Sequence, residues 1–98
     1  MTIQWFEEQA KILKTWLVNV GGLEHRVVLA KETQDVWVDS RKVETAGEFS
    51  EEGAETHFTV DNQPAFIRTV SSGNRHRGVI QTLIVGNVEV SEYKEIPQ

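Results

Sequence analysis

The chain has 98 residues, of which 39% are hydrophobic, and it contains no cysteine. Its 10 basic and 15 acidic residues give a net charge of −5 at pH 7, so it lacks the excess of lysine and arginine that binds nucleic-acid phosphates. The missing cysteines exclude disulfides, thiolate metal ligands and a cysteine nucleophile. We expect one domain with one core, located in the cytoplasm and bound neither to nucleic acid nor to a membrane.

The first segment, IQWFEEQAKILKTW, has the hydrophobic spacing of a helix. Apolar side chains recur there three and four residues apart, among residues that favour helices. We therefore expect a short helix from about Gln4 to Lys14, and we assign residues 1–14 to a linker that precedes the domain. Its apolar stripe needs a cover, which is either its own domain, a second copy or a domain absent from this chain.

From Thr15 onward the hydrophobic period is two, which is typical of strands. Gly21 and Gly22 suit a two-residue hairpin turn, because glycine adopts the positive φ that such turns need. This register places five apolar residues and His25 on one side of the hairpin, where we expect a hydrogen-bonded core histidine. The facing pairs are Trp16/Val27, Val18/His25 and Val20/Leu23.

A second hairpin is predicted in DVWVDSRKVE, with Asp39 and Ser40 at its turn. In this register Val36, Val38 and Val43 point to the core and Trp37 lies on the opposite face. Further short alternating runs, separated by polar turns, continue to residue 93. Together they predict an all-β domain over residues 15–93, an antiparallel β-sandwich of about seven to eight strands. Residues 94–98 form a tail.

The stretch VETAGEFSEEGAETHF concentrates carboxylates between two predicted strands. Glu55 and His57 share a face of a strand, which offers a metal ion two ligands rather than the three or four it needs. We interpret the segment as a solvated acidic loop, with Phe49 and Phe58 as core anchors. Buried carboxylate pairs and a nucleophile elbow are not recognisable in the sequence, so we expect no catalytic residues, metal or cofactor.

Several separated blocks of the strand region are distinctive: Asp35-Val36-Trp37, Glu44-Thr45-Ala46-Gly47-Glu48-Phe49, Gly53, Glu55-Thr56-His57-Phe58, Val70-Ser71-Ser72-Gly73 and Thr82-Leu83-Ile84-Val85. Through these blocks, most of the strand region resembles the C-terminal domain of the Fas apoptotic inhibitory molecule family. The departures are Val38, where the family usually has cysteine, and Asp39-Ser40, where its turn tends to be Asn-Gly.

The resemblance implies a cytosolic, non-enzymatic regulator of apoptosis that follows a first β-sandwich domain. It also implies roles in death-receptor, NF-κB and neurotrophin signalling and in protection against protein aggregation, with partners among signalling or misfolded proteins. We predict three protein-interaction surfaces, of which Trp37 is the first. The other two are the acidic segment, with Glu48, Glu51, Glu52 and Glu55, and the basic turn with Arg75 and Arg77. The alternatives are a metal-dependent hydrolase and a structural domain that self-associates through its N-terminal segment.

Overall fold

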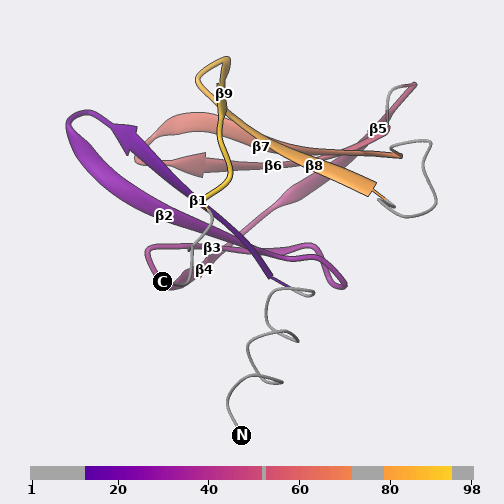
Figure 1. The fold of residues 1–98 in the computed structure, drawn as a ribbon, viewed down its shortest axis with the longest axis horizontal. Coiled ribbons are helices and arrows are strands. Elements are labelled where there is room, and N and C mark those ends of the chain that lie inside the picture. The colour runs from indigo at the N-terminus through magenta and orange to yellow at the C-terminus, as the bar shows by residue number, and fades with distance from the viewer. Residues whose placement is uncertain (1–12, 52, 72–78, 94–98) are drawn as a thin grey trace, which may run out of the picture.

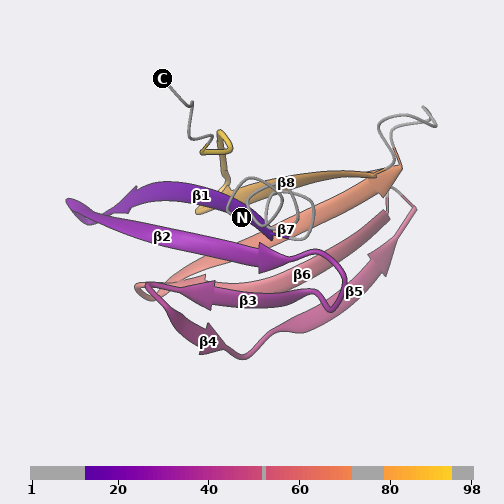
Figure 2. The ribbon, with the colours of Figure 1, turned by 60° about the horizontal axis from the view of Figure 1, so that its bottom comes forward.

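The computed structural model describes residues 13–51, 53–71 and 79–93. These residues form two antiparallel sheets that pack as two layers (Figures 1 and 2). In each sheet the strands follow one another in chain order, and the chain passes from one sheet to the other between β4 and β5. The first sheet contains β1 (Leu13–Val20), β2 (Leu23–Ala30), β3 (Asp35–Val38) and β4 (Arg41–Val43). The second contains β5 (Ala46–Ser50), β6 (Gly53–Val60), β7 (Gln63–Ser71), β8 (Val79–Val85) and β9 (Val88–Val90).

The predicted all-β fold is confirmed, with nine strands described in place of about seven to eight. The acidic segment supplies the main additional strand, because Ala46–Ser50 pairs with β6 and is not a loop. The sequence does not predict this strand, because residues 46–49 are all exposed and therefore lack the alternation of buried and exposed residues that identifies a strand. Among the described residues there is no helix that could span a membrane.

The predicted N-terminal helix lies mostly outside the described residues. Its last two residues, Leu13 and Lys14, belong instead to β1, where they pair with Ala30 and Leu29. The helical prediction is wrong for these two residues. Pairing with a full-length neighbouring strand outweighs the weak helix preference of leucine and lysine.

Both predicted hairpin registers are confirmed. Gly21 and Gly22 have φ angles of 61° and 84°, and Asp39 and Ser40 have 51° and 70°. Two residues with side chains thus adopt the left-handed conformation at the second turn. The Asp39 carboxylate compensates, because it accepts hydrogen bonds from the Arg26 backbone N–H at 2.9 Å and from the His25 ring at 2.6 Å.

The core lies between the sheets and follows the period-two pattern of the strands. Phe58 is buried, as predicted, but Phe49 is 94% exposed, so its predicted role as a core anchor is wrong. Phe49 pairs with Ala54 in the edge strand β5, where the first sheet does not cover its ring. The buried hydrophobic residues are Trp16, Val18, Val27, Leu29, Val36, Phe58, Val60, Ala65, Ile67, Leu83 and Val85.

The two sides of the sandwich differ. On the closed side, the edge strand β1 meets the segment that follows β9: Trp16 forms a β-bridge with Glu92, and the Tyr93 N–H donates to the Thr15 carbonyl at 2.9 Å. The Lys14 ammonium adds a hydrogen bond to the Gln81 carbonyl at 2.9 Å and lies 3.4 Å from the Glu92 carboxylate. On the open side, β4 and β5 are the edges of their sheets.

Candidate functional site

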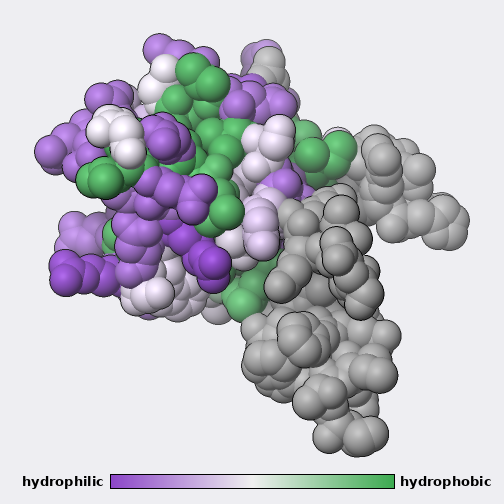
Figure 3. Space-filling model, turned by 60° about the vertical axis from the view of Figure 1, so that its left-hand side comes forward, coloured by the Kyte–Doolittle hydropathy of each residue, from purple (hydrophilic) through white to green (hydrophobic). Residues whose placement is uncertain are grey.

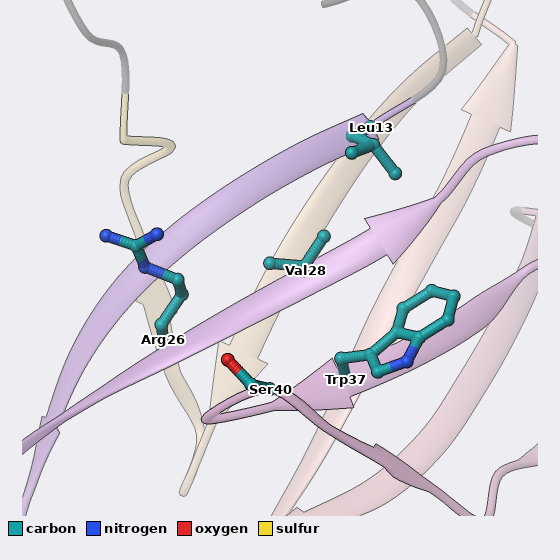
Figure 4. Close-up of a pocket in the computed structure, with 5 residues that line it drawn as sticks. All are labelled: Leu13, Arg26, Val28, Trp37 and Ser40. Carbon is teal, nitrogen blue, oxygen red and sulfur yellow. The ribbon is translucent and has the colours of Figure 1, made fainter. Parts of the chain in front are cut away.

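A hollow of about 420 Å³ lies on the outer face of the first sheet. Trp37 forms part of it, half-buried and on the face away from the core, as the sequence predicts. Figure 4 shows Val28 between Trp37 and Leu13, with Arg26 and Ser40 toward the other end. The pairing of β2 with β3 brings two of the lining residues together, because Trp37 lies directly opposite Val28.

The lining combines an indole ring, two aliphatic side chains, a hydroxyl and a guanidinium. Beside it, the Lys42 ammonium lies 3.5 Å from the Asp35 carboxylate. Tryptophan and arginine contribute most to binding energy at protein interfaces, because they offer large contact areas with polar tips. The hollow can therefore hold an apolar side chain that has an acceptor or an acidic group next to it.

A row of charged residues crosses the outer face of the second sheet. The His57 Nε2 atom lies 3.0 Å from Glu55 Oε1 and 3.4 Å from Glu48 Oε2, and Arg68 Nη2 lies 3.3 Å from Glu55 Oε2. Phe66 lies beside both His57 and Arg68: its ring centroid is 5.1 Å from that of His57 and 5.4 Å from the Arg68 guanidinium carbon. We call Glu48, Glu55, His57 and Arg68 the ionic row.

The ionic row contains more metal-ligating groups than the sequence indicates. Ligand atoms of Glu48, Glu55 and His57 all lie within 4.8 Å of one another, so three groups converge where spacing along one strand predicts two. The third is Glu48, which pairs with Glu55 across β5 and β6. Spacing along the sequence does not reveal Glu48 as a third ligand, because the sequence predicts a loop where β5 lies. One imidazole and two carboxylates suit zinc or another divalent cation, although Arg68 already binds Glu55.

The structure separates the predicted acidic surface into different environments. Glu48 has a side chain that is 67% exposed, whereas that of Glu55 is 17% exposed and is bonded to Arg68 and His57. Glu51 is exposed in the turn. Glu52, Arg75 and Arg77 lie outside the described residues. Among the predicted candidates, the structure therefore brings together Glu48 and Glu55, with Trp37 apart from them on the other sheet.

His25 joins turns of both sheets at one end of the sandwich. Its Nδ1 donates to Asp39 Oδ2 at 2.6 Å, and its Nε2 lies 3.9 Å from Asp61 Oδ2, in the turn between β6 and β7. The Arg26 backbone N–H and, after it, His25 lower the pKa of Asp39 from its ordinary 3.8. The predicted hydrogen bond of His25 is therefore present, but the residue is half-buried at the end of the sandwich and does not belong to the core. Figure 3 shows the molecule with this side brought forward, where hydrophilic residues lie next to a band of hydrophobic ones.

Comparison with known proteins gives a consistent result. The family model described as Fas apoptotic inhibitory molecule matches residues 2–93. Three relatives bear the name Fas apoptotic inhibitory molecule 1: those of Rattus norvegicus and Mus musculus are 48% identical to the chain and that of Homo sapiens is 45% identical, each over 91% of the chain. The match covers 44%, 50% and 50% of these relatives, so the chain spans about half of their length.

Proposed function

The chain belongs to the Fas apoptotic inhibitory molecule family, and from this we propose that it inhibits Fas-mediated cell death as a non-enzymatic, cytoplasmic protein-interaction domain. The names of its relatives support the anti-apoptotic role. The chain spans about half of those relatives. We therefore propose that this domain supplies one part of the activity of a longer protein, in which it follows an N-terminal β-sandwich domain.

The Trp37 hollow is the observation that supports an interaction role. A tryptophan on the core-distant face of a sheet contributes nothing to the core, yet Trp37 lies beside Val28 and Leu13 in a concave apolar surface. Arg26 at its margin is exposed and available to an acidic group. Such a surface fits a protein partner of death-receptor or survival signalling, including the NF-κB and neurotrophin pathways, or a misfolded protein.

The test compares Trp37→Ala and Arg26→Ala with Tyr93→Ala as the matched control. Tyr93 is a partly exposed aromatic residue on the closed side, away from the hollow. Each variant is expressed in cells treated with Fas ligand, and its thermal unfolding is measured separately. Both hollow variants should weaken partner binding and protection by about tenfold or more, with Tyr93→Ala unchanged.

Arg26→Ala keeps the test decisive if Trp37→Ala unfolds, because the Arg26 side chain is exposed and its backbone N–H remains to bond Asp39. Undiminished protection by folded variants of the hollow would refute its role. Concentration-dependent sedimentation of the chain with and without residues 1–14 tests the separate proposal of self-association through that segment.

The ionic row supports a second candidate function, divalent-cation binding with weak hydrolase activity. Titration calorimetry with Zn²⁺, Ca²⁺ and Mg²⁺ tests it, with Glu48→Gln and His57→Gln as variants that each remove one ligand. Stoichiometric binding that both variants abolish would establish the site. Heat changes that do not depend on Glu48 would refute it.

A further inference from the structure

Strand β5 is an edge strand whose one charged side chain is that of Glu48. Within the described chain it pairs with β6 alone. An edge strand presents unpaired backbone N–H and C=O groups to which another strand can pair. Phe49 also gives this edge an exposed apolar surface, because its ring is 94% exposed.

The other three edges are protected in ways that β5 is not. Strands β1 and β9 end at the closed side, where the Trp16–Glu92 bridge joins the two sheets. Strand β4 has three residues, two of which are the exposed cations Arg41 and Lys42. Short length and basic side chains are common means of preventing edge-to-edge pairing. Strand β5 has five residues, none of them basic and none of them proline.

The charges along this edge select the kind of partner. Glu44, Glu48 and Glu51 are exposed on β5 and its flanks, and residues 44–51 contain no lysine or arginine. A second copy of β5 would bring the same carboxylates close together, which is unfavourable. A strand with lysine or arginine opposite Glu48 would instead form cross-strand ion pairs.

The two faces of β5 specify the partner further. Glu48 lies on the outer face, where His57 and Glu55 also lie, and Phe49 lies on the opposite face, which Thr56 and Phe58 share. A strand that pairs with β5 would therefore place basic side chains on one face and apolar side chains on the other. Alternating polar and apolar residues are typical of a β-strand, because successive side chains point to opposite faces of the sheet.

We propose that β5 binds an extended segment of a partner protein by strand addition, and that the segment alternates basic and apolar residues. Main-chain hydrogen bonds hold the segment, while Glu48 and Phe49 select its side chains. The inference goes beyond the proposed function, because β5 and the Trp37 hollow belong to different sheets.

The experiment uses the full chain and two synthetic peptides of the same length, one alternating lysine with valine and one alternating glutamate with valine. Hydrogen exchange followed by NMR reports on the backbone amides of β5. We expect the lysine peptide to bind and to slow amide exchange within residues 46–50 by about tenfold, and the glutamate peptide not to bind. Phe49→Ser should weaken this binding, and the double variant Glu48→Lys/Glu51→Lys should bind the glutamate peptide instead.

Three outcomes would overturn the proposal. Binding of the lysine peptide without amide protection in β5 would indicate charge attraction alone. Protection that grows with chain concentration in the absence of peptide would indicate pairing between two copies. Failure of both peptides to protect β5 would show that the edge is not used. Trp37→Ala should bind the lysine peptide normally, so this result is independent of the cell-death assay.

Discussion

The closed and open sides of the sandwich are built from the same two sheets but treat their edges in opposite ways. On the closed side, main-chain bonds and the Lys14 side chain link β1 to the second sheet, and Trp16 is 1% exposed behind them. On the open side, β5 ends its sheet with an exposed carboxylate and an exposed ring. From this difference we expect substitutions on the closed side to affect stability more than substitutions at the exposed edge of β5.

The largest effect should follow from breaking the closed side at its core. Trp16→Ala removes the largest fully buried side chain and should lower the free energy of unfolding by about 3–5 kcal/mol, because the cavity cannot fully collapse. Chemical denaturation followed by circular dichroism measures this. A loss of less than about 1 kcal/mol would show that the closed side does not dominate stability.

The next effect should come from the hairpin that holds β5. Gly53 has a φ of 144°, and a Cβ there would overlap with the backbone carbonyl oxygen of Thr69. Gly53→Ala should therefore cost about 2–3 kcal/mol in the free energy of unfolding and should speed amide exchange in β5. Gly47→Ala is the control, since a Cβ at Gly47 meets nothing within 4 Å. Equal losses in the two variants would contradict the prediction.

A smaller effect on stability, which depends on pH, is expected at the end of the sandwich where His25 bonds to Asp39. The pKa of Asp39 is lowered in the folded chain by the Arg26 N–H and by His25. Its contribution to stability is therefore complete above the ordinary pKa of 3.8 and is lost as the pH falls through the lowered value. The Tm difference between the unchanged chain and Asp39→Asn should therefore shrink as the pH falls below 3.8. A constant difference would indicate that the carboxylate charge has no role.

The smallest effect should be found on the open side itself. Phe49→Ser removes a ring that is 94% exposed, so the free energy of unfolding should change by less than about 0.5 kcal/mol. The same substitution should reduce binding of the lysine peptide. A large loss of stability would mean that Phe49 packs against other residues in solution, and the contrast between the two sides would no longer hold.

The sequence predicts the parts of this fold in which turn chemistry and hydrophobic alternation agree. Both hairpin registers follow from Gly21-Gly22 and Asp39-Ser40 with their flanking valines. The prediction that Phe49 is a core anchor fails because phenylalanine is often buried but can also lie exposed at the edge of a sheet.

The candidate sites divide in the same way. The period-two pattern predicts the correct face for Trp37, whereas the hollow beside it depends on the register between β2 and β3. The convergence of Glu48 with His57 was missed because β5 has no buried side to reveal it as a strand. Partners that meet across an undetected strand pair cannot be found from spacing along the chain alone.

The bond between Tyr93 and Thr15 also has a mechanical consequence. It places the start of β1 beside the segment after β9, so the chain enters and leaves the domain at one corner. A pulling force applied at Leu13 and Tyr93 would act first on the bonds between β1 and the segment after β9. These bonds would break one after another before the force reached the rest of the core. Leu13 and Tyr93, the first and last described residues, therefore lie on the closed side, with β5 at the opposite edge of its sheet.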